Sequence, residues 1–190
     1  MLFRSASELI TERGIVVQPL NTIRQLGYVV SNLEESLKYW IEILGVGPFF
    51  MIEHCALREQ IYRGRHSAVD VDIALGNSGD VQIELIFQHN SNELSIYNES
   101  NPAGHLGLHH FGLMPPDFEL ARTQFMREGC EEVFACTVSG AQLSYFDTRA
   151  QVGHFTEIWE QSHVFNDVAQ MVEDAAKKWD GLNPVRPMPS

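Results

Sequence analysis

The sequence predicts an α+β fold in which the element order βαβββ occurs twice and forms a mixed sheet shaped as a cleft or half-barrel. The first observation is an internal repeat: when His110 is set on Gln25, the run His110-Phe111-Gly112-Leu113 aligns with Gln25-Leu26-Gly27-Tyr28. The second is that Asn32 and Asp117 stand seven residues after these two leading residues, where a helix is expected to begin. A repeat of this length defines the architecture of the chain.

Composition limits the class of protein. The 190 residues are 44% hydrophobic, which is enough for one domain or two small fused modules. The net charge of -12 would repel nucleic-acid phosphates and anionic membrane surfaces, so neither is expected as a partner. No segment resembles a signal peptide or a membrane span, and a cytoplasmic location is the expectation. Three cysteines lack Cys-x-x-Cys spacing and are expected to be reduced packing residues: Cys55, Cys130 and Cys136.

The first repeat is expected within residues 22–88, after an N-terminal arm (residues 1–21) that could contain a short helix over residues 5–13. A strand is expected over residues 22–30. Ser31-Asn32-Leu33-Glu34 has the pattern of a capping box with Ser31 as the N-cap, and apolar residues at helical spacing continue to Leu44, before Gly45. Three strands should follow, over residues 49–55, 68–75 and 81–87, with residues 76–80 as the turn between the last two.

The second repeat is expected within residues 107–161, after a polar linker and flap over residues 89–106. Its helix should begin with Asp117 as the N-cap and end at Arg127. Its strands are expected over residues 108–114, 131–138, 142–147 and 153–160. Residues 162–190 should hold a final helix, over residues 165–179, whose one-sided apolar residues are typical of a packing helix or of a homodimer contact.

Aligning the repeats also aligns their last strands, so that Glu84 falls on Glu157. Each repeat then offers one polar side chain from its first strand and one glutamate from its last: Gln25, Glu84, His110 and Glu157. Any one of these could be an ordinary polar strand residue, but two carboxylates gathered without a counter-ion would repel each other. One divalent metal ion (Zn, Mn, Co, Ni or Mg) would resolve this conflict and leave positions for the carbonyl or carboxylate oxygens of a small-molecule substrate. Alternation along the strand places Gln82, Glu84 and Ile86 on one face, and the apolar residues between them on the other.

Over about residues 22–161, the chain resembles the vicinal oxygen chelate superfamily, which includes glyoxalase I, methylmalonyl-CoA epimerase, extradiol dioxygenases and bleomycin-resistance proteins. The resemblance rests on residues 29–37 with Leu44-Gly45, residues 81–85, Gly107-Leu108-His109-His110 and Thr156-Glu157-Ile158. It implies a glyoxalase-like fold with metal ligands at the four positions named above. The ligand set is similar to that of eukaryotic glyoxalase I, whereas the surrounding motifs are more similar to the epimerase.

The resemblance implies an enzyme in which the metal holds substrate oxygens and stabilises an enolate. We therefore expect a metal-dependent isomerase or epimerase that removes a proton next to a carbonyl, on an acyl-CoA or a related acid. Glu157 is one candidate base, as in glyoxalase I, and Asp72 is the other, because its strand resembles the one that carries an epimerase base. The alternatives are a glyoxalase I-like lactoylglutathione lyase, a ligand-binding protein of the bleomycin-resistance type and, disfavoured because Gln25 stands where a histidine ligand is required, an extradiol dioxygenase.

Three arginines precede the strand that carries Asp72: Arg58, Arg63 and Arg65. Arg63 and Arg65 are the candidate substrate-binding residues, because guanidinium groups bind carboxylates and phosphates such as those of CoA or glutathione. In so acidic a protein the same arginines could equally form ion pairs at the surface.

Overall fold

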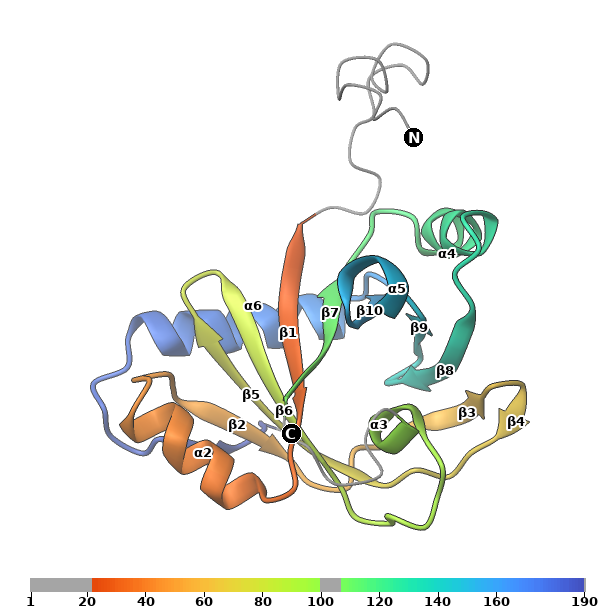
Figure 1. The fold of residues 1–190 in the computed structure, drawn as a ribbon. Coiled ribbons are helices and arrows are strands. Elements are labelled where there is room, and N and C mark those ends of the chain that lie inside the picture. Colours follow the sequence, from red (N-terminus) through yellow and green to blue (C-terminus); the bar gives the residue numbers. More distant parts are fainter. Residues whose placement is uncertain (1–21, 100–106, 190) are drawn as a thin grey trace, which may run out of the picture.

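One mixed sheet of eleven strands organises the computed structural model, which describes residues 22–99 and 107–189 (Figure 1). The expected N-terminal arm and its helix lie outside the described residues. The order of strands across the sheet is β11-β2-β5-β6-β1-β7-β10-β9-β8-β3-β4. The strands are β1 (Ile23–Val29), β2 (Phe49–Ile52), β3 (Arg58–Tyr62), β4 (Arg65–His66), β5 (Val71–Ser78), β6 (Val81–Gln88), β7 (Gly107–Leu113), β8 (Glu132–Val138), β9 (Ala141–Phe146), β10 (Phe155–Trp159) and β11 (Val185–Pro187). The helices are α2 (Leu33–Glu42), α3 (Ile96–Glu99), α4 (Phe118–Arg127), α5 (Arg149–Val152) and α6 (His163–Lys177).

The two strands at the middle of the sheet come from the two halves of the sequence repeat. β1 pairs in parallel with β6 and antiparallel with β7, and β7 pairs in parallel with β10. Apart from the β3–β4 hairpin and the short helix α5, each half has one strand, one helix and three further strands. The first half contains β1, α2, β2, β5 and β6, and the second contains β7, α4, β8, β9 and β10. The predicted α+β class with a mixed sheet is confirmed.

The long helices of the two halves begin in the same way. Asn32 and Asp117 both have extended backbones, and their side chains accept the N–H groups of Glu35 and Leu120. Both predicted helix starts are therefore confirmed. The assignment of Ser31 as N-cap is wrong, because the extended residue that satisfies the first turn is Asn32, one position later.

The hairpin β3–β4 is the largest departure from the predicted element order. Its turn residues Arg63 and Gly64 have φ angles of 45° and 75°, the left-handed pair that a tight two-residue hairpin requires. β3, which precedes this turn, lies in the other half of the sheet, where it pairs antiparallel with β8. A contact with a strand so far along the chain leaves no periodic pattern in the local sequence, so neither strand was predicted.

Gly76 was interpreted as a turn residue, and the strand predicted over residues 68–75 is therefore wrong in its bounds. This strand runs from Val71 to Ser78. The turn expected over residues 76–80 is only Gly79-Asp80, since Ser78 already pairs with Val81. Gly76 is a strand residue that pairs with Ile83, and glycine fits there because a Cβ atom would lie 2.9 Å from the ring of Phe49. The other predicted strand ends agree within three residues, α6 was predicted two residues late, and α3, α5 and β11 were not predicted.

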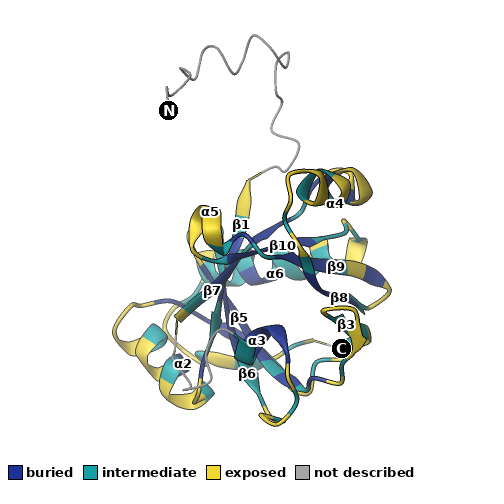
Figure 2. Ribbon diagram, turned by 45° about the vertical axis from the view of Figure 1, so that its right-hand side comes forward, coloured by how far each residue is buried: buried dark blue, intermediate teal, exposed yellow. Residues whose placement is uncertain are grey.

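Helices cover the two faces of the β5–β6 region. Leu37 and Trp40 of α2 pack against Ile83 and Leu85, whereas Val172 of α6 belongs to the cluster that contains Ile86. The predicted alternation along this strand is therefore confirmed. Figure 2 shows that burial is concentrated on the sheet and that the outer sides of α2 and α4 are exposed.

Two further findings concern the cysteines and the apolar length of the helices. All three cysteines are free thiols within or against the hydrophobic clusters, as expected. Among the described helices, none is both long enough and apolar enough to cross a membrane.

Candidate metal centre

Two rows of paired residues cross the middle of the sheet, and each row has a glycine at its centre. In one row, Gly27 of β1 lies between Glu84 of β6 and His110 of β7. In the other, Gly112 of β7 lies between Gln25 of β1 and Glu157 of β10. Because directly paired residues of adjacent strands project to the same face, all four polar side chains share one face of the sheet.

The four predicted ligand residues converge on the Nε2 atom of His110. This atom lies 3.4 Å from Gln25 Oε1 and 3.3 Å from both Glu84 Oε2 and Glu157 Oε2. His110 is fully buried, and each of the other three residues is no more than 8% exposed. The structure thus gathers one nitrogen and three oxygens from four strands into a single interior cluster.

Glycine is required in both rows because there is no space for a side chain. A Cβ atom on Gly27 would lie 1.9 Å from Cε1 of His110, and one on Gly112 would lie 2.2 Å from the Trp159 ring and 2.9 Å from Cβ of Gln25. Gly27 therefore leaves room for the imidazole of His110, whereas Gly112 leaves room for the Trp159 ring and for Cβ of Gln25.

The charges of the cluster are poorly compensated by the described residues. Burial raises the pKa of Glu84, and the neighbouring Glu157 carboxylate adds to this while His110 opposes it. Burial would lower the pKa of His110, but the carboxylates of Glu157 and Glu84 outweigh it and raise this pKa to about 9. Glu84 Oε2 is buried without a hydrogen-bond partner among the described residues, although it lies within ion-pair distance of the imidazole. Such an acceptor is costly unless something positive binds it.

A divalent ion fits this donor set. Two ligands held about 2.1 Å from a common ion, at octahedral to tetrahedral angles, lie roughly 3.0–3.4 Å apart. The three distances from His110 Nε2 fall within or at the edge of this range. One imidazole, one amide oxygen and two carboxylates suit Zn, Mn, Co, Ni or Mg, and they would satisfy the orphaned oxygen of Glu84.

Two hydrogen bonds orient the amide and imidazole side chains of the cluster. Gln25 Nε2 donates to Gln82 Oε1 at 2.8 Å, which leaves Gln25 Oε1 directed at the centre. His109 Nε2 lies 3.0 Å from the carbonyl oxygen of Ile96 in α3, which can only accept, so this nitrogen carries the proton. Burial and the adjacent His110 lower the pKa of His109 to about 3, so its Nδ1 accepts from Nδ1–H of His110, 3.0 Å away. The Nε2 atom of His110 is then the one available to a metal.

The sequence did not reveal the supporting role of three residues: His109, Tyr97 and Tyr145. A hydrogen-bonded pair is the ordinary interpretation of the histidine doublet, and the structure has this bond, but nothing in the sequence indicated that it would orient His110. Tyr145 pairs with Glu157 across β9 and β10, and its hydroxyl lies 3.3 Å from that of Tyr97 in α3. Both tyrosines are buried beside the cluster, and no spacing in the sequence connects them to it.

The structure does not bring Asp72, the second candidate base, together with the ligand cluster. Asp72 pairs with Phe87, whereas Leu75 pairs with Glu84, and positions three apart on a strand face opposite sides. The Asp72 carboxylate accepts the backbone N–H of His54 at 2.8 Å and lies 2.9 Å from Nε2 of His89. Of the two candidate bases, only Glu157 lies within the cluster.

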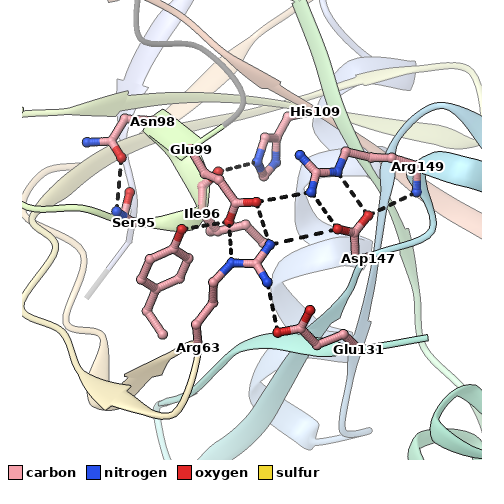
Figure 3. A network of polar contacts seen from close by, with 10 residues as sticks. Arg63, Ser95, Ile96, Asn98, Glu99, His109, Glu131, Asp147 and Arg149 are labelled. Atoms are coloured by element: carbon pink, nitrogen blue, oxygen red, sulfur yellow. Dashed lines mark hydrogen bonds and ion pairs between the residues drawn. The ribbon is translucent and has the colours of Figure 1, made fainter. Parts of the chain in front are cut away.

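Arg63, one of the candidate substrate-binding arginines, is held by carboxylates outside the ligand cluster. Arg63 donates to Glu99 at 2.5 Å and to Glu131 at 2.8 Å, and lies 3.8 Å from Asp147 (Figure 3). Figure 3 also shows Arg149 pointing toward Glu99 and Asp147, so the two arginines bracket the end of α3. Arg65 and Arg58 are exposed in the β3–β4 hairpin. These contacts give Arg63 a structural role that accounts for its position.

Comparison with known proteins identifies the family. Residues 24–146, more than half of the chain, match the model of the Glyoxalase/Bleomycin resistance protein/Dioxygenase superfamily. The chain belongs to this superfamily. Among curated proteins, no sequence match was found.

Solved structures with the same fold share little sequence with this chain. A hypothetical protein from Bacillus halodurans C-125 is 19% identical with a TM-score of 0.54, over 75% of this chain and 95% of that one. Methylmalonyl-CoA epimerase from Mycobacterium tuberculosis is 11% identical with a TM-score of 0.54, over 83% and 99% of the two chains. A methylmalonyl-CoA epimerase in complex with methylmalonyl-CoA and NH4+ is 15% identical with a TM-score of 0.53, over 76% and 97%. At these identities the likeness concerns the glyoxalase-like fold.

Proposed function

We propose that this protein is a divalent-metal-dependent enzyme that removes a proton from the carbon next to a substrate carbonyl. The reaction would be an epimerisation or isomerisation of an acyl-CoA or a related acid. The observation that carries the proposal is the convergence of three oxygens, from Gln25, Glu84 and Glu157, on Nε2 of the fully buried His110. A structural cluster of this kind, with two carboxylates in the interior, is costly without a cation.

Gln25, Glu84, His110 and Glu157 would hold the ion. When bound, it would supply positive charge beside the carbonyl oxygen on which negative charge develops as the proton leaves. The described chain supplies the dry surroundings that strengthen this interaction, because all four residues are buried. Its hydrogen bonds from Gln25 to Gln82 and from His110 to His109 fix two of the donors before substrate arrives.

Glu157 is our candidate for the base. In the proposed step, a Glu157 carboxylate oxygen swings off the ion and takes the proton from the α-carbon. The C–H bonding pair becomes the C=C bond of the enolate, and the C=O π pair moves onto the carbonyl oxygen. As that pair moves back, solvent water delivers a proton to the opposite face of the same carbon and Glu157 returns its proton to solvent, which completes an epimerisation. Glu157 is preferred to Asp72 because its carboxylate lies 3.3 Å from His110 Nε2, whereas Asp72 is on the other face of the sheet.

The choice of substrate class follows from the solved relatives. The solved relatives that are named as methylmalonyl-CoA epimerases share the fold, and one of them was solved with methylmalonyl-CoA. An acyl-CoA or a related acid is therefore the first class of substrate to test.

Solvent-deuterium exchange tests the reaction directly. The protein is stripped of metal, reloaded with Mn, Co, Ni, Zn or Mg in separate samples, and incubated in deuterated water with methylmalonyl-CoA and related thioesters. We expect deuterium at the α-carbon, with a reloaded sample and not with the stripped one. Absence of exchange with every ion and thioester would contradict the epimerase proposal.

Matched glutamate variants separate the base from general effects. Glu157→Gln keeps an oxygen donor but cannot take a proton, so exchange should fall by about 100-fold or more. Glu42→Gln, on the exposed side of α2, should exchange like the wild type. Asp72→Asn tests the other candidate: normal exchange in this variant would remove Asp72 from the reaction.

A glyoxalase I-like lyase is the second candidate, and the donor set favours it. One glutamine, one histidine and two glutamates form the cluster, which is the set that the resemblance to glyoxalase I implies. Its substrate would be the hemithioacetal of glutathione with methylglyoxal. Conversion of this hemithioacetal, without exchange into thioesters, would favour the lyase, and ligand binding without either reaction would indicate a bleomycin-resistance-type binding protein.

A further inference from the structure

A second group of metal-ligand side chains lies away from the central cluster, at one end of β5 and β6. It contains His54 in the turn after β2, Asp72 of β5 and His89 directly after β6. Each offers one donor atom, and these atoms lie within 4.8 Å of one another. The two imidazole rings are stacked, with centroids 4.7 Å apart and an angle of 25° between their planes.

The backbone around His54 adopts an unusual conformation that builds this group. His54 has a φ angle of 47°, a left-handed conformation that non-glycine residues rarely adopt. In this conformation its N–H donates to Asp72 Oδ1 at 2.8 Å, so the turn is tied to the carboxylate of the group. His89 is tied to the same region, because its N–H donates to the carbonyl oxygen of Asp70 at 2.9 Å. Strained residues of this kind persist where neighbouring contacts hold them, and they are concentrated at functional sites.

A fourth residue orients one of the histidines. Asp70 lies 2.9 and 3.0 Å from Nδ1 of His54 and holds the orientation of that ring. Carboxylates that bind one nitrogen of a histidine commonly orient metal-binding imidazoles, and Nε2 of His54 would then be the nitrogen left for an ion. Phe87 contacts the His89 ring edge to face at 5.0 Å and limits its movement.

We infer that His54, Asp72 and His89 form a second divalent-metal site, separate from the central cluster and open to solvent. Two imidazoles and one carboxylate select a borderline transition-metal ion such as Zn²⁺, Ni²⁺ or Cu²⁺, whereas Mg²⁺ and Ca²⁺ prefer oxygen ligands. The central cluster offers three oxygens and one nitrogen, so the two sites differ in preference as well as in place. An ion here would join the turn after β2 to β5 and to the end of β6.

The ordinary alternative is a pair of hydrogen-bonded surface histidines. His54 is exposed, and its pKa is raised by the hydrogen bond and charge of Asp70. Protons would therefore compete with a metal for the group, and mildly alkaline buffer is the suitable condition for a test. A hydrogen-bonded pair without metal affinity would survive there unchanged when Zn²⁺ is added.

Calorimetric titration of the metal-free full chain with Zn²⁺ tests the inference. We expect the wild type to bind one more ion than the double variant His54→Gln/His89→Gln, in which this binding event is lost. His66→Gln, an exposed histidine of β4, is the control and should match the wild type. If the central cluster binds no zinc, the wild type should show one event and the double variant none, so failure of the proposed function leaves the test intact.

A second measurement uses the wild-type protein alone and guards against misfolding of the variant. Ni²⁺ is paramagnetic, so its stepwise addition up to two equivalents, enough to fill both proposed sites, should broaden the ring proton resonances of His54 and His89 before those of His66 and His163. Equal zinc binding by wild type and a folded double variant, or uniform broadening of all exposed histidines, would overturn the second site.

Discussion

Gly27 lies directly opposite His110 on the two central strands, and a Cβ atom at Gly27 would approach the imidazole to 1.9 Å. Gly112 lies directly opposite Gln25 in the same way, and a Cβ atom there would lie 2.2 Å from the Trp159 ring and 2.9 Å from Cβ of Gln25. The glycine in each sequence run is therefore a partner of the polar residue in the other run. The runs Gln25-Leu26-Gly27 and His110-Phe111-Gly112 therefore lie opposite each other, and the glycine of each run pairs with the polar residue of the other.

We predict that Gly27→Ala disrupts the cluster. The added methyl group must displace His110, so stability should fall by about 1–3 kcal/mol, as in other overpacked interiors, and binding of a divalent ion should be lost. Urea unfolding and metal content after reloading measure the two effects.

Gly107→Ala is the control, because Gly107 lies on the same strand as His110 and no described atom would lie within 4 Å of its Cβ. It should match the wild type in metal content. Equal metal content in Gly27→Ala and Gly107→Ala would contradict a requirement for glycine opposite His110.

Protons and the metal should compete for His110. Without metal, burial opposes but the carboxylates of Glu157 and Glu84 raise the pKa of His110 to about 9. Below that pH the imidazole carries a proton on the nitrogen that faces the carboxylates, and a metal must displace it. Affinity should therefore rise by about tenfold per pH unit up to this pKa and level off above it. Competition with a chelator of known pH dependence measures the slope, and a flat profile below this pKa would contradict His110 as a ligand.

The Arg122–Glu132 pair should contribute to stability above acidic pH. Arg122 donates to both oxygens of Glu132, at 2.6 and 2.7 Å, and Ser144 donates to one of them at 2.7 Å. Burial opposes the effect, but these hydrogen bonds lower the pKa of Glu132 below its ordinary value of 4.5. A lowered pKa means that the stabilisation is present above pH 4.5 and is lost as the pH falls through the lower, folded-state value.

Glu132→Gln should therefore reduce the free energy of unfolding at neutral pH by about 1–2 kcal/mol and flatten its loss in acid. Glu119→Gln is the matched control, because Glu119 is exposed and lies 3.7 Å from the same arginine. Denaturant unfolding at neutral and acidic pH measures both variants. Equal acid sensitivity of Glu132→Gln and wild type would show that this pair does not govern the loss.

Arg63 and Arg65 should respond differently to replacement. Arg63→Ala removes hydrogen bonds to two carboxylates, Glu99 and Glu131, so it should lower the melting temperature. Arg65→Ala should leave the melting temperature unchanged, because Arg65 is exposed in β4. Once a substrate is known, a rise in KM for Arg65→Ala alone would support substrate binding by Arg65, and a rise for Arg63→Ala without loss of stability would contradict its structural role.

The sequence made the middle of the sheet predictable because the repeat carries paired information. Gln25 and His110, with Glu84 and Glu157, hold equivalent positions in two runs, so each half tests the interpretation of the other. The periphery has no such counterpart. The β3 strand pairs with β8 across the sheet, and Gly76 supports a close approach by Phe49 although glycine usually suggests a turn. Whether Asp72 lies on the same face as Glu84 depends on the register between β5 and β6. The strand was predicted three residues too early, so the sequence did not reveal this register.

His109 should control the metal affinity of its neighbour without contacting the ion. Its Nδ1 accepts from His110 Nδ1, and its Nε2 binds the carbonyl oxygen of Ile96, so it fixes the imidazole of His110 by way of α3. His109→Leu would leave a buried donor on His110 without a partner, at a cost of about 1–3 kcal/mol. Metal affinity should fall by about 10–100-fold, as when other partners of metal-binding histidines are removed. His109→Gln offers an amide oxygen that can accept the same hydrogen bond, so it should recover part of the affinity. Calorimetric titration compares the two variants with the wild type, and equal affinities in His109→Leu and wild type would show that His110 needs no such support.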